Sequence, residues 1–284
     1  MTRTLLDNAL LLQATAGKDN IDDRSFAAPP PARIPEYYTL LTTNPTPTSL
    51  SGFKIGIIKE GMNMPGLDPR IHKTVSNAIS LFANLGASVS EVSIPFHSKG
   101  TAIWTPISKA GNFHSRMNRA FGRRGHALTE LNTLFHPLTQ EKWDNAYVST
   151  KNIFLNGAYA ENVFPGVLSK ATNLSRRLRD EYDAALKEYD ILVLPNLPYL
   201  PNTNVEKSAT PLEMIAKQVG LTANTAPFNQ SGHPVLAMPV GMLVVEEGGA
   251  KLPVSMQIVG RWWAEAEVYR AAYAWSLAFD WKMM

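Results

Sequence analysis

The segment from Phe53 to Ile94 constrains the fold more than any other part of the sequence. Phe53 to Lys59 is a short apolar run typical of a buried strand. Asp68 to Leu85 has the spacing of an amphipathic helix ended by Gly86, and Ser88 to Ile94 alternates like a strand. A strand, a helix and a second strand in this order normally form a parallel pair joined by a right-handed crossover. The sequence therefore predicts an α/β fold.

Further elements are predicted on both sides of this βαβ unit. They are a helix over 4–16, a proline-rich extended connector over 26–52, helices over most of 103–188 with breaks near 122–125, at Pro137 and at Pro165, a buried strand over 191–194, a helix over 211–219, strands over 235–239 and 254–259 joined by a polar hairpin turn, and a closing helix over 264–279. The chain therefore divides into residues 1–25, the connector 26–52, the βαβ unit 53–95, a helical region 103–188 and C-terminal strands and a helix over 189–284.

Composition excludes several classes of function. The 27 basic and 24 acidic residues give a net charge of only +3, which is too small a bias to indicate nucleic acid or a membrane surface as a partner. The absence of cysteine excludes disulfides, thiol nucleophiles and cysteine-based zinc sites. No uninterrupted run approaches the roughly 20 apolar residues that span a bilayer. We expect a cytoplasmic protein.

The sequence lacks most of the familiar motifs of catalytic, metal and phosphate sites. The six histidines show no close ligand spacing, so no metal is expected, and the sequence contains no G-x-S-x-G elbow and no phosphate-binding glycine loop, so no cofactor is expected. One S-x-x-K match, Ser51 to Lys54, leads directly into a predicted strand, where residues three apart point to opposite faces. We interpret it as a chance match and not as a catalytic pair.

Two basic clusters leave two interpretations open. They comprise Arg119, Arg123 and Arg124, and Arg176, Arg177 and Arg179. A nucleic-acid site would join such residues into one stripe with interleaved aromatic side chains. Asp180, Glu181 and Asp183 follow the second cluster at helical spacing, which favours a solvated face with ion pairs.

Four segments, in order, resemble motifs of the amidase signature family, particularly its aliphatic and aromatic amide hydrolases. The most specific, Asn224 to Pro234 (NTAPFNQSGHP) continuing to Gly241, resembles the family's NTAPFxxTGHPxLxxPxG. The other three are GKDNIDDR (17–24), YDILVLPNLP (189–198) and LPVSMQIVGR (252–261). The family pattern has threonine at Asn196 and glycine at Ser255. The resemblance implies that the fold is the C-terminal part of the family's mixed-sheet α/β/α architecture, with a helical insertion.

The resemblance also implies the chemistry of the family. Members hydrolyse an amide to a carboxylic acid and ammonia or an amine, using a serine nucleophile, a second serine held through a cis peptide, and a lysine base. Backbone N–H groups of a Gly/Ser-rich loop stabilise the oxyanion, and each good donor contributes about 3 kcal/mol. No such loop occurs in this sequence, whose only Gly-Gly pair, Gly248-Gly249, precedes Ala250 and Lys251. The catalytic Ser/cis-Ser/Lys triad is therefore absent, and no catalytic residue is assigned.

The first residues resemble a family segment that lies downstream of the missing loop. Met1 to Gln13 is similar to the family's GPmtRtvxDaalLLqxiaG. We therefore expect residues 1–284 to be a partial amidase domain, with the lysine and both serines encoded upstream of Met1 or lost. We also expect exposed apolar sheet edges, low stability and no hydrolysis by the chain alone. The alternative is a non-catalytic module, derived from an amidase, that binds a small molecule or a partner.

What remains for this chain is part of a pocket for a small-molecule amide. The resemblance places Trp104 in a stretch similar to a tryptophan-bearing pocket segment of the aromatic-amide branch, and Ile258 on a late strand, so both are candidate substrate-binding residues. The alternative is that each has a purely structural role as a core residue. A structural role is favoured for His233, because the family assigns no catalysis to a histidine.

Overall fold

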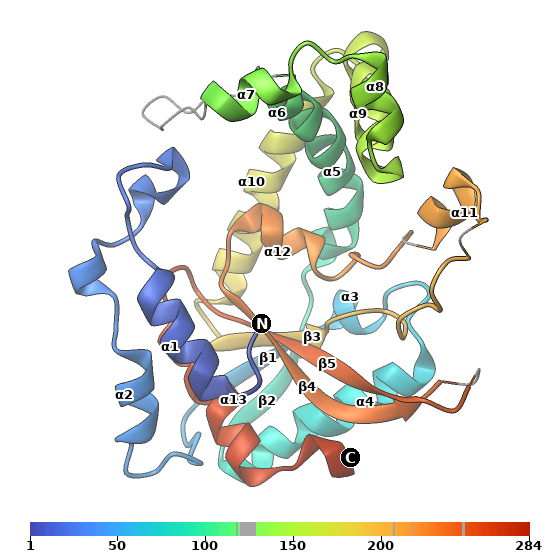
Figure 1. Cartoon of the computed structure of the whole chain (residues 1–284). Coiled ribbons are helices and arrows are strands. Elements are labelled where there is room, and N and C mark those ends of the chain that lie inside the picture. Colours follow the sequence, from blue (N-terminus) through green and yellow to red (C-terminus); the bar gives the residue numbers. More distant parts are fainter. Residues whose placement is uncertain (118, 120–128, 207, 218, 246–247) are drawn as a thin grey trace.

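The sheet of the molecule has five strands in the order β2-β1-β3-β5-β4 (Figure 1). The computed structural model describes residues 1–117, 119, 129–206, 208–217, 219–245 and 248–284. The strands are β1 (Lys54–Ile58), β2 (Ser88–Val92), β3 (Ile191–Pro195), β4 (Val235–Val244) and β5 (Lys251–Val259). β1 pairs in parallel with both β2 and β3, whereas β5 is antiparallel to β3 and to β4. The predicted parallel βαβ unit and the late hairpin are both confirmed.

Helices account for most of the remaining described chain. They are α1 (Leu5–Thr15), α2 (Tyr37–Thr42), α3 (Lys59–Met62), α4 (Pro69–Ser80), α5 (Gly100–Pro106), α6 (Asn112–Arg116), α7 (Thr129–Phe135), α8 (Gln140–Asn145), α9 (Val148–Val163), α10 (Val167–Ala185), α11 (Pro211–Ala216), α12 (Ala226–Ser231) and α13 (Glu265–Ala278). Short 3₁₀ turns occupy Asp23–Ala27, Pro31–Arg33, Leu81–Leu85, Pro95–Lys99 and Trp281–Met283.

One face of the sheet is covered by α4 and α13. The predicted amphipathic helix over 68–85 is α4 followed by the 3₁₀ turn Leu81–Leu85, and it ends at Gly86, whose φ of 92° favours glycine. Ile71 and Val75 of α4 pack with Ile55 of β1 in the largest core cluster. Trp275 of α13 joins the same cluster and is fully buried.

The opposite face of the sheet is covered by α10 and α12. Leu178 and Tyr182 of α10 form a second core cluster with Phe228 of α12 and with Leu192 and Leu194 of β3. All five residues of β3 are buried, as expected for a strand enclosed on both sides. The molecule therefore has three α/β/α layers, and the predicted fold class is confirmed.

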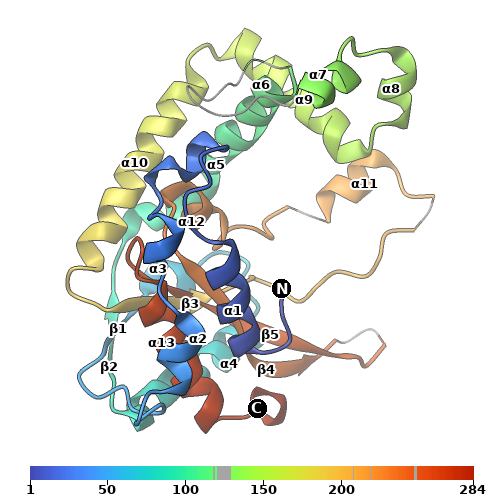
Figure 2. The same cartoon turned by 60° about the vertical axis from the view of Figure 1, so that its left-hand side comes forward.

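A group of helices projects beyond the sheet and is connected to it by α10 (Figures 1 and 2). It consists of α6 to α9, and α5 and α6 are joined by a π-helical segment, Ile107–Gly111. Gly157 of α9 allows close approach here, because a Cβ at that position would lie 2.2 Å from Cβ of Phe113. The predicted break near 122–125 lies outside the described residues.

The proline-rich segment is more regular than predicted. α2 forms within it, because Tyr37 and Leu41 bury their side chains against α1 and α13. Tertiary packing of these two residues outweighs the extended preference of the flanking prolines. The hairpin strands are also longer than predicted and extend almost to the turn at Gly248.

The outer edge of β4 carries both exposed apolar side chains and partial cover. Val235 and Val244, at the two ends of β4, are exposed. The N–H of Met242 donates to the carbonyl of Met284 at 3.1 Å, so the last residues cover part of this edge. Pro239 lacks a donor, and the register shifts between Pro239 and Gly241. The low stability expected from an exposed sheet edge stays a prediction.

Candidate functional site

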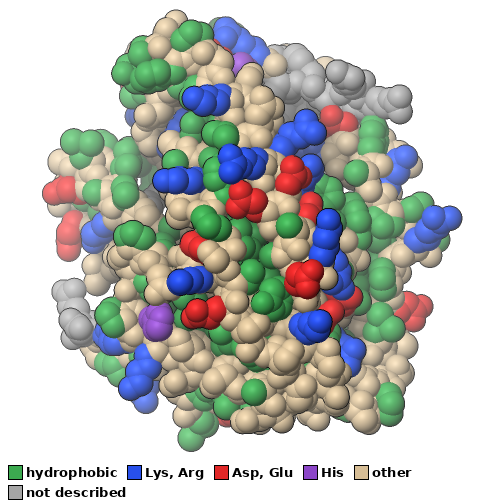
Figure 3. Space-filling view, turned by 180° about the vertical axis from the view of Figure 1, so that it is seen from behind, with side chains coloured by type: hydrophobic (Ala, Val, Ile, Leu, Met, Phe, Trp, Pro, Cys, Tyr) green, Lys and Arg blue, Asp and Glu red, His purple; other side chains and the backbone are tan. Residues whose placement is uncertain are grey.

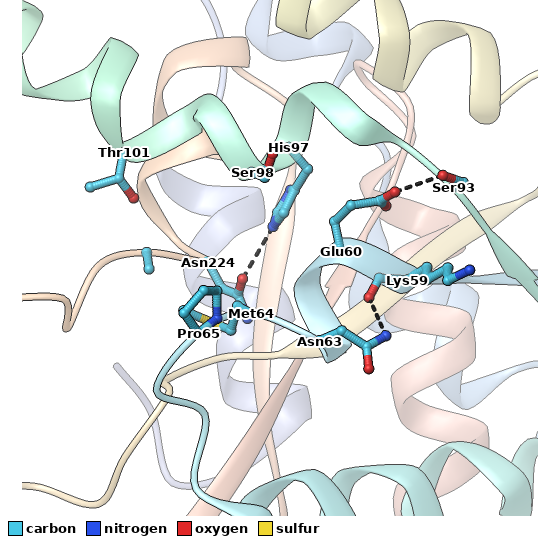
Figure 4. A pocket seen from close by; sticks show the side chains of 11 residues that line it. Lys59, Glu60, Asn63, Met64, Pro65, Ser93, His97, Ser98, Thr101 and Asn224 are labelled. Atoms are coloured by element: carbon cyan, nitrogen blue, oxygen red, sulfur yellow. Dashed lines mark hydrogen bonds between the residues drawn. The ribbon is translucent and has the colours of Figure 1, made fainter.

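A cavity of about 500 Å³ opens where the parallel strands β1 and β2 end (Figure 4). Because β1, β2 and β3 are parallel, the residues that follow them lie at the same edge of the sheet, where open α/β sheets commonly bind ligands. Polar lining comes from the segments after β1 and β2 and from the loop before α12. The polar lining residues are Lys59, Glu60, Asn63, Ser93, His97, Ser98, Thr101 and Asn224, and the apolar ones are Met64, Pro65 and Ala223.

Glu60 joins the ends of β1 and β2. Its carboxylate accepts hydrogen bonds from the Ser93 hydroxyl (2.6 Å) and from the backbone N–H of Ile94 (2.7 Å). Burial raises the pKa of Glu60, but these hydrogen bonds outweigh burial and hold the pKa below its usual value. Glu60 therefore presents a fixed negative charge at the cavity.

Asn224, the first residue of the NTAPFNQSGHP segment, is the centre of a buried polar network. Its side-chain amide donates to the carbonyls of Gly61 (3.2 Å) and Pro195 (2.9 Å). Its backbone carbonyl accepts from Gln257 Nε2 of β5 (2.9 Å). One residue thus connects α3 after β1, the last residue of β3, and β5, and it fixes the loop that enters α12.

His97 completes this network, and its partners fix its tautomer. The amide of Asn224 is oriented by its two carbonyl acceptors, so its Oδ1 accepts from His97 Nε2–H at 3.1 Å. His97 Nδ1 then accepts from the hydroxyl of Tyr182 at 2.6 Å. Both ring nitrogens are engaged, so His97 is a neutral positioning residue and not a free base. Burial lowers the pKa of His97, and the bond to Asn224 only partly offsets this.

His233 forms a second buried contact on the other side of α12. Its Nδ1 lies 2.9 Å from Ser231 Oγ, and its Nε2 lies 3.2 Å from Asp183 Oδ1 of α10. Burial lowers the pKa of His233, and the charge of Asp183 opposes this effect. His233 connects α12 to α10, a geometry consistent with the structural role predicted for it.

These two histidines predict a pH dependence of stability. Both have a folded-state pKa below the usual 6.5, so below that pH the unfolded chain binds protons that the folded chain does not. Stability is therefore complete above pH 6.5 and declines as the pH falls toward the folded-state pKa values, by at most about 1.4 kcal/mol per pH unit for each histidine. Urea unfolding at pH 7.5, 6.5 and 5.5 measures this decline. We expect His97→Gln to reduce the slope, and an unaltered slope in this variant would contradict the assignment.

The predicted pocket residues are not among those that line this cavity. Ile258 is fully buried on β5, between Val193 of β3 and Leu236 of β4. Trp104 lies half-buried on α5, one turn beyond Thr101. Neither is among the described residues that line the cavity, and their role in substrate binding stays a prediction.

Sequence reasoning passed over Glu60, Ser93 and His97. A usable signal was present, because polar residues directly after two parallel strands must share one edge of the sheet. The structure agrees with the interpretation of the Ser51–Lys54 match as a chance match, because Lys54 begins β1 and Ser51 lies in the preceding turn.

The two departures from the family pattern contact each other. Asn196 follows β3 and Ser255 lies on the adjacent strand β5. Asn196 Nδ2 donates to Ser255 Oγ at 3.0 Å, and the Asn196 backbone N–H donates to the Ser255 carbonyl at 3.0 Å. The two side chains therefore form one local unit beside the Asn224 network.

The charged face of α10 agrees with the salt-bridged interpretation. Arg177 pairs with Glu181 (3.4 Å), and Arg179 lies 3.4 Å from Asp180 and 3.9 Å from Asp183. Basic and acidic side chains are interspersed over the face shown in Figure 3. Arg123 and Arg124 of the other basic cluster lie outside the described residues.

The part of the chain that the structure describes lacks two further classes of site. No group of three or more histidine, aspartate or glutamate side chains there is arranged to hold a metal ion. Within the same residues, no helix combines the length and apolar character needed to cross a bilayer.

The three-layer fold is that of the amidase-signature enzymes. It matches a bacterial aryl acylamidase of the amidase signature family with a TM-score of 0.73 and 20% identity, covering 99% of this chain and 52% of that one. It matches 6-aminohexanoate cyclic dimer hydrolase with a TM-score of 0.72 and 20% identity, covering 99% of this chain and 54% of that one.

Sequence comparison defines the family directly. The model of the Amidase family matches residues 1–269. The A subunit of the glutamyl-tRNA(Gln) amidotransferase from Microcystis aeruginosa is 30% identical over 281 residues, which cover 98% of this chain and 54% of the relative. Its counterpart from Geobacillus stearothermophilus is 29% identical over 283 residues, covering 99% of this chain and 54% of the relative. The chain belongs to the amidase family, and it spans about half the length of these curated relatives.

Proposed function

We propose that this chain takes part in the hydrolysis of a small-molecule amide to a carboxylic acid and ammonia or an amine, and that residues outside these 284 supply the nucleophile. The match of the Amidase model over residues 1–269 is the observation that carries the proposal. Nearly half the length of the Microcystis aeruginosa relative has no counterpart here. The absence of a Gly-Ser-Ser loop from the sequence is consistent with that division of roles.

In this arrangement the chain positions the substrate. Asn224 and His97 hold the loop before α12 against the ends of β1 and β3, and a rigid loop is what a substrate wall requires. The Ser/cis-Ser/Lys group and the oxyanion donors would come from the portion that is not present. The relatives named as amidotransferase subunits support a further part of the proposal, that the chain works together with another polypeptide.

The chain by itself is expected to release no detectable ammonia from propanamide or benzamide. The reason is that loss of an activated serine nucleophile costs roughly 10⁶-fold in turnover. Ammonia is measured by a coupled enzymatic assay on the purified 284-residue chain. Hydrolysis by this chain alone would refute the assignment of roles.

The complementary arm of the test adds a polypeptide that contains the Gly/Ser loop and the lysine of a family member. We expect ammonia release to appear with this polypeptide and to vanish when its nucleophilic serine is replaced by alanine. If the added polypeptide binds the chain and no hydrolysis appears, the proposal fails.

The cavity favours a second candidate function, a non-catalytic module that binds a small molecule. A space of about 500 Å³ with convergent polar groups has the size of small-molecule sites. A cooperatively unfolding chain that binds a ligand and remains inactive after complementation would favour this candidate over the first.

A further inference from the structure

Several of the side-chain donors that line the cavity are engaged within the protein, whereas the Lys59 ammonium, the Thr101 hydroxyl and one N–H of Asn63 have no hydrogen-bond partner among the described residues. The Ser93 hydroxyl proton is donated to Glu60, and the Ser98 hydroxyl donates to the Pro95 carbonyl at 2.8 Å. One N–H of the Asn63 amide is donated to the Lys59 carbonyl at 2.8 Å. These groups therefore offer a ligand mainly their acceptor oxygens.

The deeper wall also has few donors to offer. His97 donates its Nε2–H to Asn224 and accepts at Nδ1 from Tyr182. The Asn224 amide nitrogen donates to two carbonyls. Both side chains are buried and internally satisfied, so they shape the cavity without competing for a ligand's donors.

Several hydrogen-bond acceptors that line the cavity have free acceptor sites. A carboxylate accepts about four hydrogen bonds, and Glu60 uses two of its sites for Ser93 and Ile94. Asn63 Oδ1 and Thr101 Oγ1 have no hydrogen-bond partner among the described residues. A ligand rich in donors would fill these positions.

The charge of the cavity points in the same direction. Glu60 is held in its charged form by its two donors, which lower its pKa. Lys59 also lines the cavity, and its side chain extends away from Asn63, His97 and Asn224 (Figure 4). The ammonium of Lys59 forms no ion pair within the described part of the chain. The carboxylate of Glu60 likewise forms no ion pair with a described residue.

We propose that this cavity binds a small ligand with a primary ammonium group, for which Glu60 is the counter-ion. Such an ammonium would donate to the acceptor sites of Glu60 that Ser93 and Ile94 leave free. The short apolar part of the ligand lies against Met64 and Pro65. The proposal concerns binding alone and holds whether or not the chain takes part in hydrolysis.

Binding of four ligands of similar size to the purified chain tests the proposal. The ligands are n-butylammonium, n-butanol, butyramide and butyrate at pH 7.5, measured by chemical-shift titration of the ¹⁵N-labelled protein. We expect n-butylammonium to bind at least tenfold more tightly than the three others. Equal affinities for n-butylammonium and n-butanol, or no binding of n-butylammonium, would overturn the proposal. This test needs only the unmodified chain.

Variants then locate the site. Glu60→Gln keeps the shape of the side chain and is expected to weaken n-butylammonium binding at least tenfold. The matched control is Glu188→Gln, which removes the same charge from an exposed position near the amino end of β3, at the opposite edge of the sheet. Circular dichroism and the spectrum of the free protein report whether each variant is folded. A folded Glu60→Gln variant with unchanged affinity would overturn the proposal.

Discussion

Replacing Asn224 with alanine is expected to lower the free energy of unfolding by about 3–5 kcal/mol. The substitution leaves the buried carbonyl of Gly61 and the buried Nε2–H of His97 without their Asn224 partner, and it leaves the Pro195 carbonyl only the long contact with Gln257 Nε2 at 3.5 Å. Each unsatisfied buried group costs about 1–3 kcal/mol. These groups lie on three separate segments, so the loss affects the whole edge of the sheet that forms the cavity.

Urea unfolding followed by tryptophan fluorescence measures this effect. The matched control is Asn229→Ala, which removes the same side chain from an exposed position five residues further along the same segment. We expect the control to change stability by less than about 0.5 kcal/mol. Similar losses for the two variants would show that Asn224 is not the centre of the network.

The second large effect is expected for Trp275→Ala, which should cost about 3–5 kcal/mol. Trp275 is fully buried in the core between α13 and α4. Its indole Nε1–H donates to the Ala78 carbonyl at 2.9 Å, and its ring lies 5.3 Å from that of Phe279. The substitution creates a large cavity and leaves a buried carbonyl without its donor.

Thermal unfolding followed by circular dichroism measures this loss. Leu277→Ala is the control, because Leu277 lies on the same helix and is 49% exposed. It should cost less than about 1 kcal/mol. If both variants unfold at the same temperature, the packing of α13 on α4 contributes less than the structure indicates.

The sequence predicts the fold where the signal is local. Periodicity over 53–94 is sufficient for β1, α4 and β2, and turn residues around Gly248 are sufficient for the hairpin. α2 could not be predicted, because Tyr37 and Leu41 depend on contacts with α13, more than 200 residues away.

The candidate site is harder to predict because its contacts are distant in sequence. Glu60 binds residues 33 and 34 positions away, and His97 meets Asn224 across 127 positions. The resemblance to a family predicts Trp104 and Ile258 as site residues. The tendency of ligands to bind at the carboxyl ends of parallel strands instead predicts Glu60 and Ser93. The second prediction uses only strand order and finds the cavity.

The contact between Asn196 and Ser255 has a consequence for protein engineering. A chimera that takes β3 and the residue after it from a relative with threonine at position 196, and keeps β5 of this chain, leaves the Ser255 hydroxyl without its amide donor. The reverse exchange leaves the Asn196 amide facing a glycine. When segments of a relative are grafted into this protein, positions 196 and 255 should therefore be exchanged together, because their side chains depend on each other.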